Sequence, residues 1–77
     1  PGAVVLLKAV DRDAIIPGGK YVLVSRKIVT LRIVRLADGE DKLRLVAGDR
    51  ENYDDIILNV SDISSVYKVK GKLIINS

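Results

Sequence analysis

The sequence predicts an all-β fold, and three of its features lead to this prediction. Val, Ile and Leu supply almost all apolar side chains of the 77-residue chain, and the β-branched ones favour strands over helices. Residues 63–75 alternate between apolar and basic side chains, as in a strand with one buried face. Turn signals recur about every 8–12 residues, so we expect a small barrel or a set of curled sheets with about seven strands.

Three strands are predicted in the first half of the chain. Residues 3–8 are apolar at nearly every position, which indicates a strand buried on both faces. Residues 17–19 (Pro-Gly-Gly) form a turn, because glycine adopts positive φ and proline fixes its own φ. Strand 20–25 follows, and the short connection 26–27 leads into strand 28–36.

The second half contains the other predicted strands. The loop 37–41 holds an Asp-Gly pair, which is a strong hairpin signal, so strand 42–46 should run antiparallel to the strand before it. A loop containing Gly and Asp over 47–53 leads to strand 55–60. A short turn then begins the last strand, 63–75.

Residues 63–75 give the clearest alternation in the chain. One strand face is expected to carry Ile63, Tyr67, Val69, Leu73 and Ile75. The other is expected to carry Ser64, Lys68, Lys70 and Lys72, interrupted by Val66 and Ile74. Gly71 permits a bend or a bulge. A row of lysines could follow a phosphate backbone, but it is interpreted first as a solvated face or as protection of an edge strand against aggregation.

Composition limits the kinds of site. Without Cys and His, the chain has neither the usual ligands of structural zinc nor a Ser–His or Cys–His nucleophile. A Ser–Lys pair is the remaining scheme, but the serines are interpreted as turn and surface residues: Ser25, Ser61, Ser64, Ser65 and Ser77. The acids Asp54-Asp55, and Asp11 with Asp13, lack a calcium-loop pattern and are interpreted as turn and cap residues. No catalytic, cofactor-binding or metal-binding residue is therefore predicted.

The charge is mild and dispersed. A net charge of +3 comes from 13 basic and 10 acidic residues. The acids gather at predicted turns and the bases are spread along strands, unlike the clustered basic face of a typical DNA-binding module. No apolar run reaches the roughly 20 residues of a membrane span. The chain opens on Pro1-Gly2 and contains no Met, so we expect residues 1–77 to be a single β domain from a longer cytoplasmic protein.

The order of these strands resembles the C-terminal domain of LexA-like and phage repressors, the self-cleaving serine–lysine regulators. The similarity runs through five segments and covers nearly the whole chain: residues 16–24, 31–36, 42–46, 52–58 and 63–75. The resemblance implies an all-β fold of small curled sheets with an SH3-like barrel element.

The same resemblance implies that this chain lacks peptidase activity. The family's catalytic serine, in a Ser-Met motif, would lie just upstream of Pro1, because residues 1–6 look like the segment that follows it. The family's lysine base lies in a string similar to Val-Lys-Arg-Leu, which here reads Ile33-Val34-Arg35-Leu36. Val34 occupies the lysine position and cannot take a proton, and the neighbouring Arg32 stays protonated.

The resemblance also implies a regulatory function. Members of the family dimerise, often through their last strands, and a separate N-terminal helix-turn-helix domain binds DNA, so two monomers reach two half-sites. We therefore expect a homodimerising domain of a transcription regulator, in contact with DNA only through that other domain, with no membrane or small-molecule partner. The expected dimer interface consists of Tyr67, Val69, Gly71, Leu73, Ile74 and Ile75.

Two alternatives are left open. The chain could be a fragment of an active serine–lysine self-cleaving peptidase whose base stands at another position, which a Ser-Met motif before Pro1 would favour. It could also be a small basic β-barrel that binds RNA or single-stranded nucleic acid. Salt-dependent binding would distinguish that alternative from a dimerisation domain.

Overall fold

The computed structural model describes residues 2–39 and 41–75, and within these residues the chain is all-β. Six strands follow one another: β1 (Gly2–Val10), β2 (Lys20–Ser25), β3 (Val29–Leu36), β4 (Lys42–Val46), β5 (Ile56–Asn59) and β6 (Ile63–Ile75). The two helical segments are single 3-10 turns, η1 (Arg12–Ala14) and η2 (Val60–Asp62). No helix in the described residues is long and apolar enough to cross a membrane.

The all-β prediction is confirmed, and each strand lies within two residues of a predicted segment. The number of strands differs, because six are found where about seven were expected. Gly71, where the sequence permits a bend or a bulge, pairs with Leu6 of β1, and a register shift lies directly beside it. β6 continues through Gly71 to Ile75.

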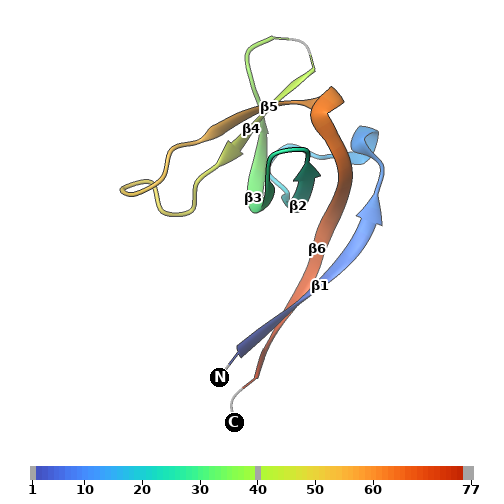
Figure 1. Cartoon of the computed structure of the whole chain (residues 1–77). Coiled ribbons are helices and arrows are strands. Elements are labelled where there is room, and N and C mark those ends of the chain that lie inside the picture. Colours follow the sequence, from blue (N-terminus) through green and yellow to red (C-terminus); the bar gives the residue numbers. More distant parts are fainter. Residues whose placement is uncertain (1, 40, 76–77) are drawn as a thin grey trace.

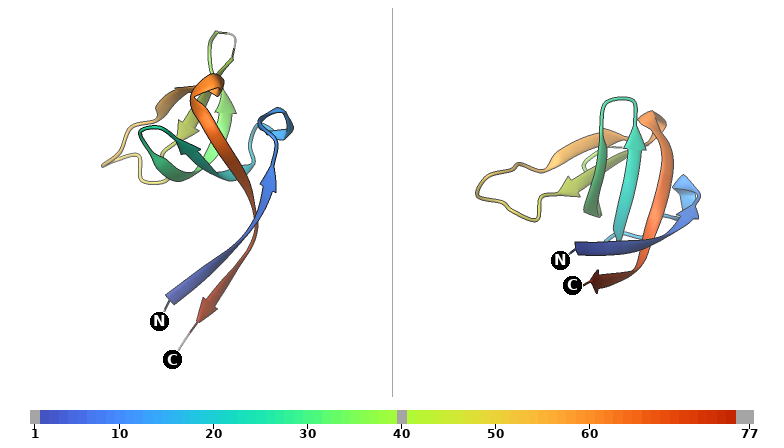
Figure 2. Two further views of the ribbon diagram at one scale, coloured as in Figure 1. Left: turned by 45° about the vertical axis from the view of Figure 1, so that its right-hand side comes forward. Right: turned by 60° about the horizontal axis from the view of Figure 1, so that its bottom comes forward.

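The six strands form one antiparallel sheet in the order β1-β6-β2-β3-β4-β5. The last strand of the chain therefore lies inside the sheet, between the first and the second. Strands β2 to β5 form a meander that curls on itself, while β1 and the second half of β6 leave the curl together as a two-stranded arm (Figure 1). Figure 2 shows the same arm from two further directions.

The core lies on the concave side of the curled sheet. Its fully buried large side chains come from three adjacent strands: Tyr21 and Leu23 (β2), Val34 (β3) and Leu45 (β4). The hydroxyl of Tyr21 accepts a hydrogen bond from the Ile16 N–H at 2.9 Å, which satisfies the polar tip of this ring. Gly19 lies so close to the ring that a Cβ there would stand 2.7 Å from Cε2 of Tyr21. The turn before β2 can therefore approach the core this closely only because residue 19 is a glycine.

Acidic side chains organise the loop between β4 and β5. Asp55 accepts a hydrogen bond from the Ala47 N–H at 3.0 Å and forms an ion pair with Arg50 at 3.3 Å. Asp49 accepts hydrogen bonds from the Asn52 side chain at 2.8 Å and from the Asn52 backbone N–H at 3.4 Å. The bond from the Asn52 side chain lowers the pKa of Asp49. These contacts agree with the interpretation of the acids in this loop as turn residues.

Replacing Leu45 by alanine tests the position of the core. Leu45 is fully buried, so Leu45→Ala should lower the free energy of unfolding by about 2–5 kcal/mol through lost burial and a residual cavity. The matched control is Leu36→Ala, since Leu36 is 66% exposed, and it should change that free energy by about 0.5 kcal/mol or less. Urea unfolding followed by circular dichroism measures both, and equal losses would contradict the placement of the core.

Candidate assembly surface

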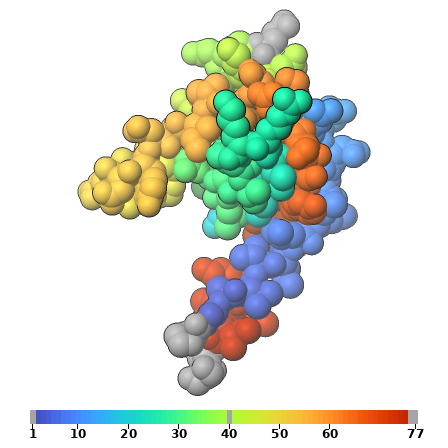
Figure 3. All heavy atoms as spheres, in the orientation of Figure 1, coloured from blue at the N-terminus to red at the C-terminus, as the bar shows by residue number. Residues whose placement is uncertain are grey.

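The two-stranded arm is the part of the fold with the least cover. It consists of residues 2–6 of β1 and 71–75 of β6, and we call it the terminal ribbon. The pairing of β2 with β6 stops at Tyr21 and Lys68, so no third strand continues along the ribbon. Figure 3 shows it projecting from the body of the molecule. Two strands alone are marginally stable in water, so the ribbon needs further contacts to hold its shape.

β6 contains an extra residue at Lys70. Leu6 of β1 pairs with Gly71, but the next residue, Leu7, pairs with Val69, and Lys70 is left between them. A bulge of this kind reverses the alternation of side chains along the strand that contains it. The two halves of β6 therefore follow opposite patterns.

The expected faces of residues 63–75 are wrong for this reason. The cross-strand partners place one set of residues on the concave side: Ile63, Val66, Lys68, Gly71, Leu73 and Ile75. They place the other set on the convex side: Ser65, Tyr67, Val69, Lys72 and Ile74. A second register shift, between Val24 and Ser25 of β2, accounts for Ile63. The expected row of lysines does not form, because Lys68 and Lys72 lie on opposite sides of the sheet.

Apolar side chains occupy both sides of the terminal ribbon. On one side Val4 pairs with Leu73, two residues before Ile75, and Ile74 lies on the other side. Leu73 is 57% exposed and Ile74 is 63% exposed. An antiparallel ribbon in water usually keeps one polar face, which this ribbon lacks. We therefore identify the terminal ribbon as a candidate assembly surface.

A second exposed apolar area lies on the convex side of the curl. β3 presents Val29, Leu31 and Ile33 on this side, and all three are exposed. Leu31 pairs with Val22 of β2, and Val22 pairs with Tyr67 of β6, so the apolar area crosses three strands. Strands that are apolar on both faces are typical of sheets covered on both faces.

The chain exposes more surface than a compact protein of its size. Its accessible area is 5743 Å², whereas a compact monomer of 8.4 kDa exposes about 4,600 Å². The Cα radius of gyration is 13.1 Å, against about 11.5 Å for a compact domain of this length. The excess of about 1,100 Å² is comparable with one partner's share of a standard interface, about 800 Å². The shape therefore leaves enough surface for a stable contact.

The residues expected at a dimer interface fall into two groups. The terminal ribbon contains four of them: Gly71, Leu73, Ile74 and Ile75. Tyr67 and Val69 instead lie in the body of the sheet and are partly buried. Only the second half of β6 has an open edge, because β2 pairs with β6 up to Lys68.

The β1 half of the ribbon is absent from the interface predicted from the sequence. Residues 3–8, predicted to be a buried strand, are largely exposed, and Val4, Leu6 and Leu7 are the clearest cases. The sequence does hold a signal for this part of the interface, namely the run of apolar residues 3–8, which indicates a strand that needs cover on both faces. It does not show which surface provides that cover.

Val34, which the resemblance places where the repressor family has a lysine, is fully buried in the core. Its N–H donates to the Gly19 carbonyl at 2.9 Å, and its own carbonyl accepts from the Gly18 N–H at 2.7 Å. Arg32, two residues earlier, donates a hydrogen bond to the Asp54 carbonyl at 3.1 Å, so it anchors the loop before β5.

The described serines hold turn and strand positions. Ser25 Oγ accepts a hydrogen bond from the Ile28 N–H at 3.2 Å in the turn between β2 and β3, and Ser64 Oγ donates one to the Val24 carbonyl at 3.0 Å. Ser77 lies outside the described residues. Residues 2–39 and 41–75 contain no group of three His, Cys, Asp or Glu side chains that could hold a metal ion.

Comparison of the chain with family models, curated proteins and solved structures finds no match. The candidate site is therefore defined by its geometry, as an apolar ribbon with an open strand edge.

Substituting Val34 by lysine tests how this position tolerates a charge. A buried ammonium without a partner should cost about 3 kcal/mol or more at pH 7, and burial lowers the pKa of such a lysine. The unfolded chain then binds more protons than the folded chain, so stability rises with pH up to the unfolded pKa of about 10.4. Urea unfolding at pH 7 and pH 10 should show a smaller loss at pH 10. Arg35→Lys, at an exposed position, is the control and should lose little at either pH. Full stability of Val34→Lys at pH 7 would show that the side chain escapes the core.

Proposed function

We propose that this chain is an oligomerisation and regulatory domain of a LexA-like or prophage-repressor transcription regulator. The observation that carries the proposal is the terminal ribbon, which is apolar on both sides and has an open edge along β6. The resemblance of the ordered strands to the repressor domain supports the class of protein. In this proposal the regulator acts in the cytoplasm, where a separate helix-turn-helix domain binds its DNA.

A second copy of the chain suits the open edge of the ribbon. Two β6 strands that pair antiparallel with their dyad at Leu73 bring Leu73 beside Leu73 of the partner subunit. Lys72 then lies beside Ile74 of the partner subunit, which keeps the two Lys72 ammonium groups out of direct opposition. The pairing joins two ribbons of two strands each into a sheet of four adjacent strands. A two-stranded ribbon is only marginally stable in water, whereas a sheet of three or more strands can be stable.

The proposed domain does not cleave itself. The buried side chain of Val34 supports this part of the proposal, because the lysine position of the family is occupied by an aliphatic residue within the core. The hydrogen bond from the Arg32 guanidinium to the Asp54 carbonyl supports a structural role for Arg32 as well.

Dimerisation through the ribbon is tested by measuring mass in solution. The 77-residue chain should sediment at about twice 8.4 kDa at high concentration. Leu73→Asp and Ile74→Asp, made separately, should each weaken the dimer by about tenfold or more, because each places a carboxylate in an apolar contact. Analytical ultracentrifugation measures the dissociation constants.

Leu36→Asp is the control for the dimer experiment, because Leu36 is similarly exposed but lies on β3. It should leave the dimer intact. A wild-type chain that stays monomeric at high concentration removes the proposed interface. An unchanged dimer in both ribbon variants would place the contact elsewhere, with the convex apolar area as the next surface to test.

Absence of self-cleavage is tested at alkaline pH, where a lysine base works best. The 77-residue chain and a longer protein that contains it should both stay intact during prolonged incubation at about pH 10, because Val34 supplies no base. Intact mass by mass spectrometry is the measurement. Discrete fragments that disappear when a serine upstream of Pro1 is replaced by alanine would contradict the proposal.

A further inference from the structure

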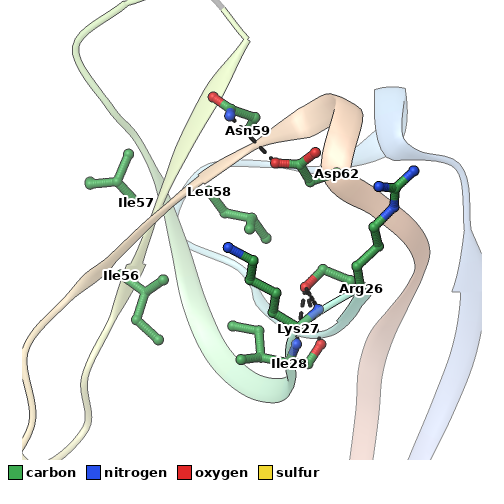
Figure 4. A pocket seen from close by; sticks show the side chains of 9 residues that line it. Arg26, Lys27, Ile28, Ile56, Ile57, Leu58, Asn59 and Asp62 are labelled. Carbon is green, nitrogen blue, oxygen red and sulfur yellow. Dashed lines mark hydrogen bonds between the residues drawn. The ribbon is translucent and has the colours of Figure 1, made fainter.

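A groove lies between the β2–β3 turn and the edge strand β5. Its volume is about 440 Å³, and it is lined by residues 25–28 of the turn, by β5 and by Asp62 of η2 (Figure 4). We call it the β5 groove. It stands at the opposite end of β6 from the terminal ribbon, since Asp62 directly precedes β6. Val34 lies toward the far end of β3, so the groove is also separate from the position of the family's lysine.

The outer edge of β5 is available for strand pairing. Val60 N–H donates to the Asp41 carbonyl at 2.8 Å, one step beyond the pairing of Asn59 with Lys42. Residues of an antiparallel pair alternate between bonding their partner and facing away from it. The N–H and C=O groups of Ile57 and Asn59 therefore face away from β4. No other described strand pairs with this edge.

Edge strands usually carry a feature that blocks pairing with another chain, such as a lysine, a proline or a bulge. β5 reads Ile-Ile-Leu-Asn and pairs with β4 in regular register, so none of these features is present within it. Its four residues make a short edge, and this edge carries no lysine, proline or bulge that would block the addition of a strand.

The groove beside this edge combines an apolar floor with a basic wall. The floor consists of Ile28, Ile56 and Leu58, which are partly buried and pack against the core. Arg26 and Lys27 rise on the opposite wall, and both are exposed. Within residues 2–39 and 41–75, neither side chain makes an ion pair or a hydrogen bond.

The basic wall is held in place by its turn. Ser25 N–H donates to the Ile28 carbonyl at 2.9 Å, and Ser25 Oγ accepts from the N–H groups of Lys27 at 3.4 Å and Ile28 at 3.2 Å. The turn backbone is thus fixed before any ligand arrives, which lowers the entropy cost of binding. Asp62, on the other side, accepts a hydrogen bond from the Asn59 side chain at 3.4 Å. Two cations and one carboxylate give the lining of the groove a formal charge of +1, which favours an acidic ligand.

We propose that the β5 groove binds an extended, acidic segment of a partner protein, which adds to β5 as a further antiparallel strand. Alternate aliphatic side chains of the segment rest on Ile28, Ile56 and Leu58, and its carboxylates meet Arg26 and Lys27. Main-chain hydrogen bonds to Ile57 and Asn59 supply affinity, and the floor and wall supply specificity. The proposal is independent of the dimer, because it uses neither the terminal ribbon nor its residues.

Binding is tested with a fluorescein-labelled peptide, Glu-Val-Glu-Ile-Glu-Val-Glu-Ala, blocked at both ends and titrated with the 77-residue chain. The expected result is saturable binding by fluorescence anisotropy, and loss of binding when every Glu of the peptide is replaced by Lys. Amide exchange by NMR should show new protection at Ile57 and Asn59 in the complex, because their outward N–H groups become hydrogen-bonded. The exchange measurement needs no variant, so it holds even if a substitution unfolds the chain.

Two variants separate the charge from the strand pairing. Arg26→Glu should weaken binding by about tenfold or more, whereas Lys72→Glu, the same charge change on the terminal ribbon, should change it by about threefold or less. Asn59→Pro removes the outward N–H and leaves the β4 ladder intact, and its φ of −74° already suits proline. This variant should also weaken binding by about tenfold, since a buried hydrogen bond and its geometry are lost.

Four results would overturn the proposal. The first is that the peptide shows no saturable binding. The second is that Lys72→Glu weakens binding of the peptide as much as Arg26→Glu does. The third is that Asn59→Pro, folded by circular dichroism, binds the peptide as well as the wild-type chain does, while the wild-type complex shows no new protection at Ile57 and Asn59. The fourth is that a single-stranded oligonucleotide displaces the peptide at equal concentration and protects the same residues, which would assign the basic wall to nucleic acid instead.

Discussion

The double pairing of β6 is the constraint on which the rest of the molecule depends. Its first half pairs with β1 on one side and with β2 on the other, and β1 reaches the curled meander only through it. Ile63 and Val66 of β6 are buried in the core, so the same strand forms part of the concave wall. Loss of this pairing would separate β1 from the core and remove the terminal ribbon together with it.

The extra residue at Lys70 joins two regions with different requirements. Before it, β6 is a central strand with a buried side and hydrogen bonds on both edges. After it, β6 is half of a two-stranded ribbon whose Leu73 and Ile74 are exposed on opposite sides. The bulge lets the chain leave the curled sheet while it keeps its pairing with β1. The core and the proposed assembly surface are thus consecutive parts of one strand.

Local sequence predicts the part of the fold that depends on local chemistry. The Pro-Gly-Gly turn at 17–19 leads into β2 and the Asp-Gly loop joins the β3–β4 hairpin, as predicted, and Gly18 and Gly39 have the positive φ that such turns require. The faces of residues 63–75 could not be predicted, because Lys70 is extra only relative to β1, more than 60 residues earlier in the chain. The β5 groove was missed for a similar reason, since it brings the turn at 25–28 beside a strand about 30 residues later. Both features depend on tertiary register, which alternation within a single segment does not encode.

β6 follows in the sequence both of the strands that it pairs with, and this order has a consequence for synthesis on the ribosome. β1 and β2 emerge first, but their shared neighbour β6 is the last of these six strands, so neither can complete its pairing until residues 63–75 have left the exit tunnel. During that interval the nascent chain presents the apolar edges of two strands to every other protein nearby. Pairing over so long a separation is also slow to form. The interval before β6 inserts between β1 and β2 is therefore the stage of folding at which these two strands are most exposed to aggregation.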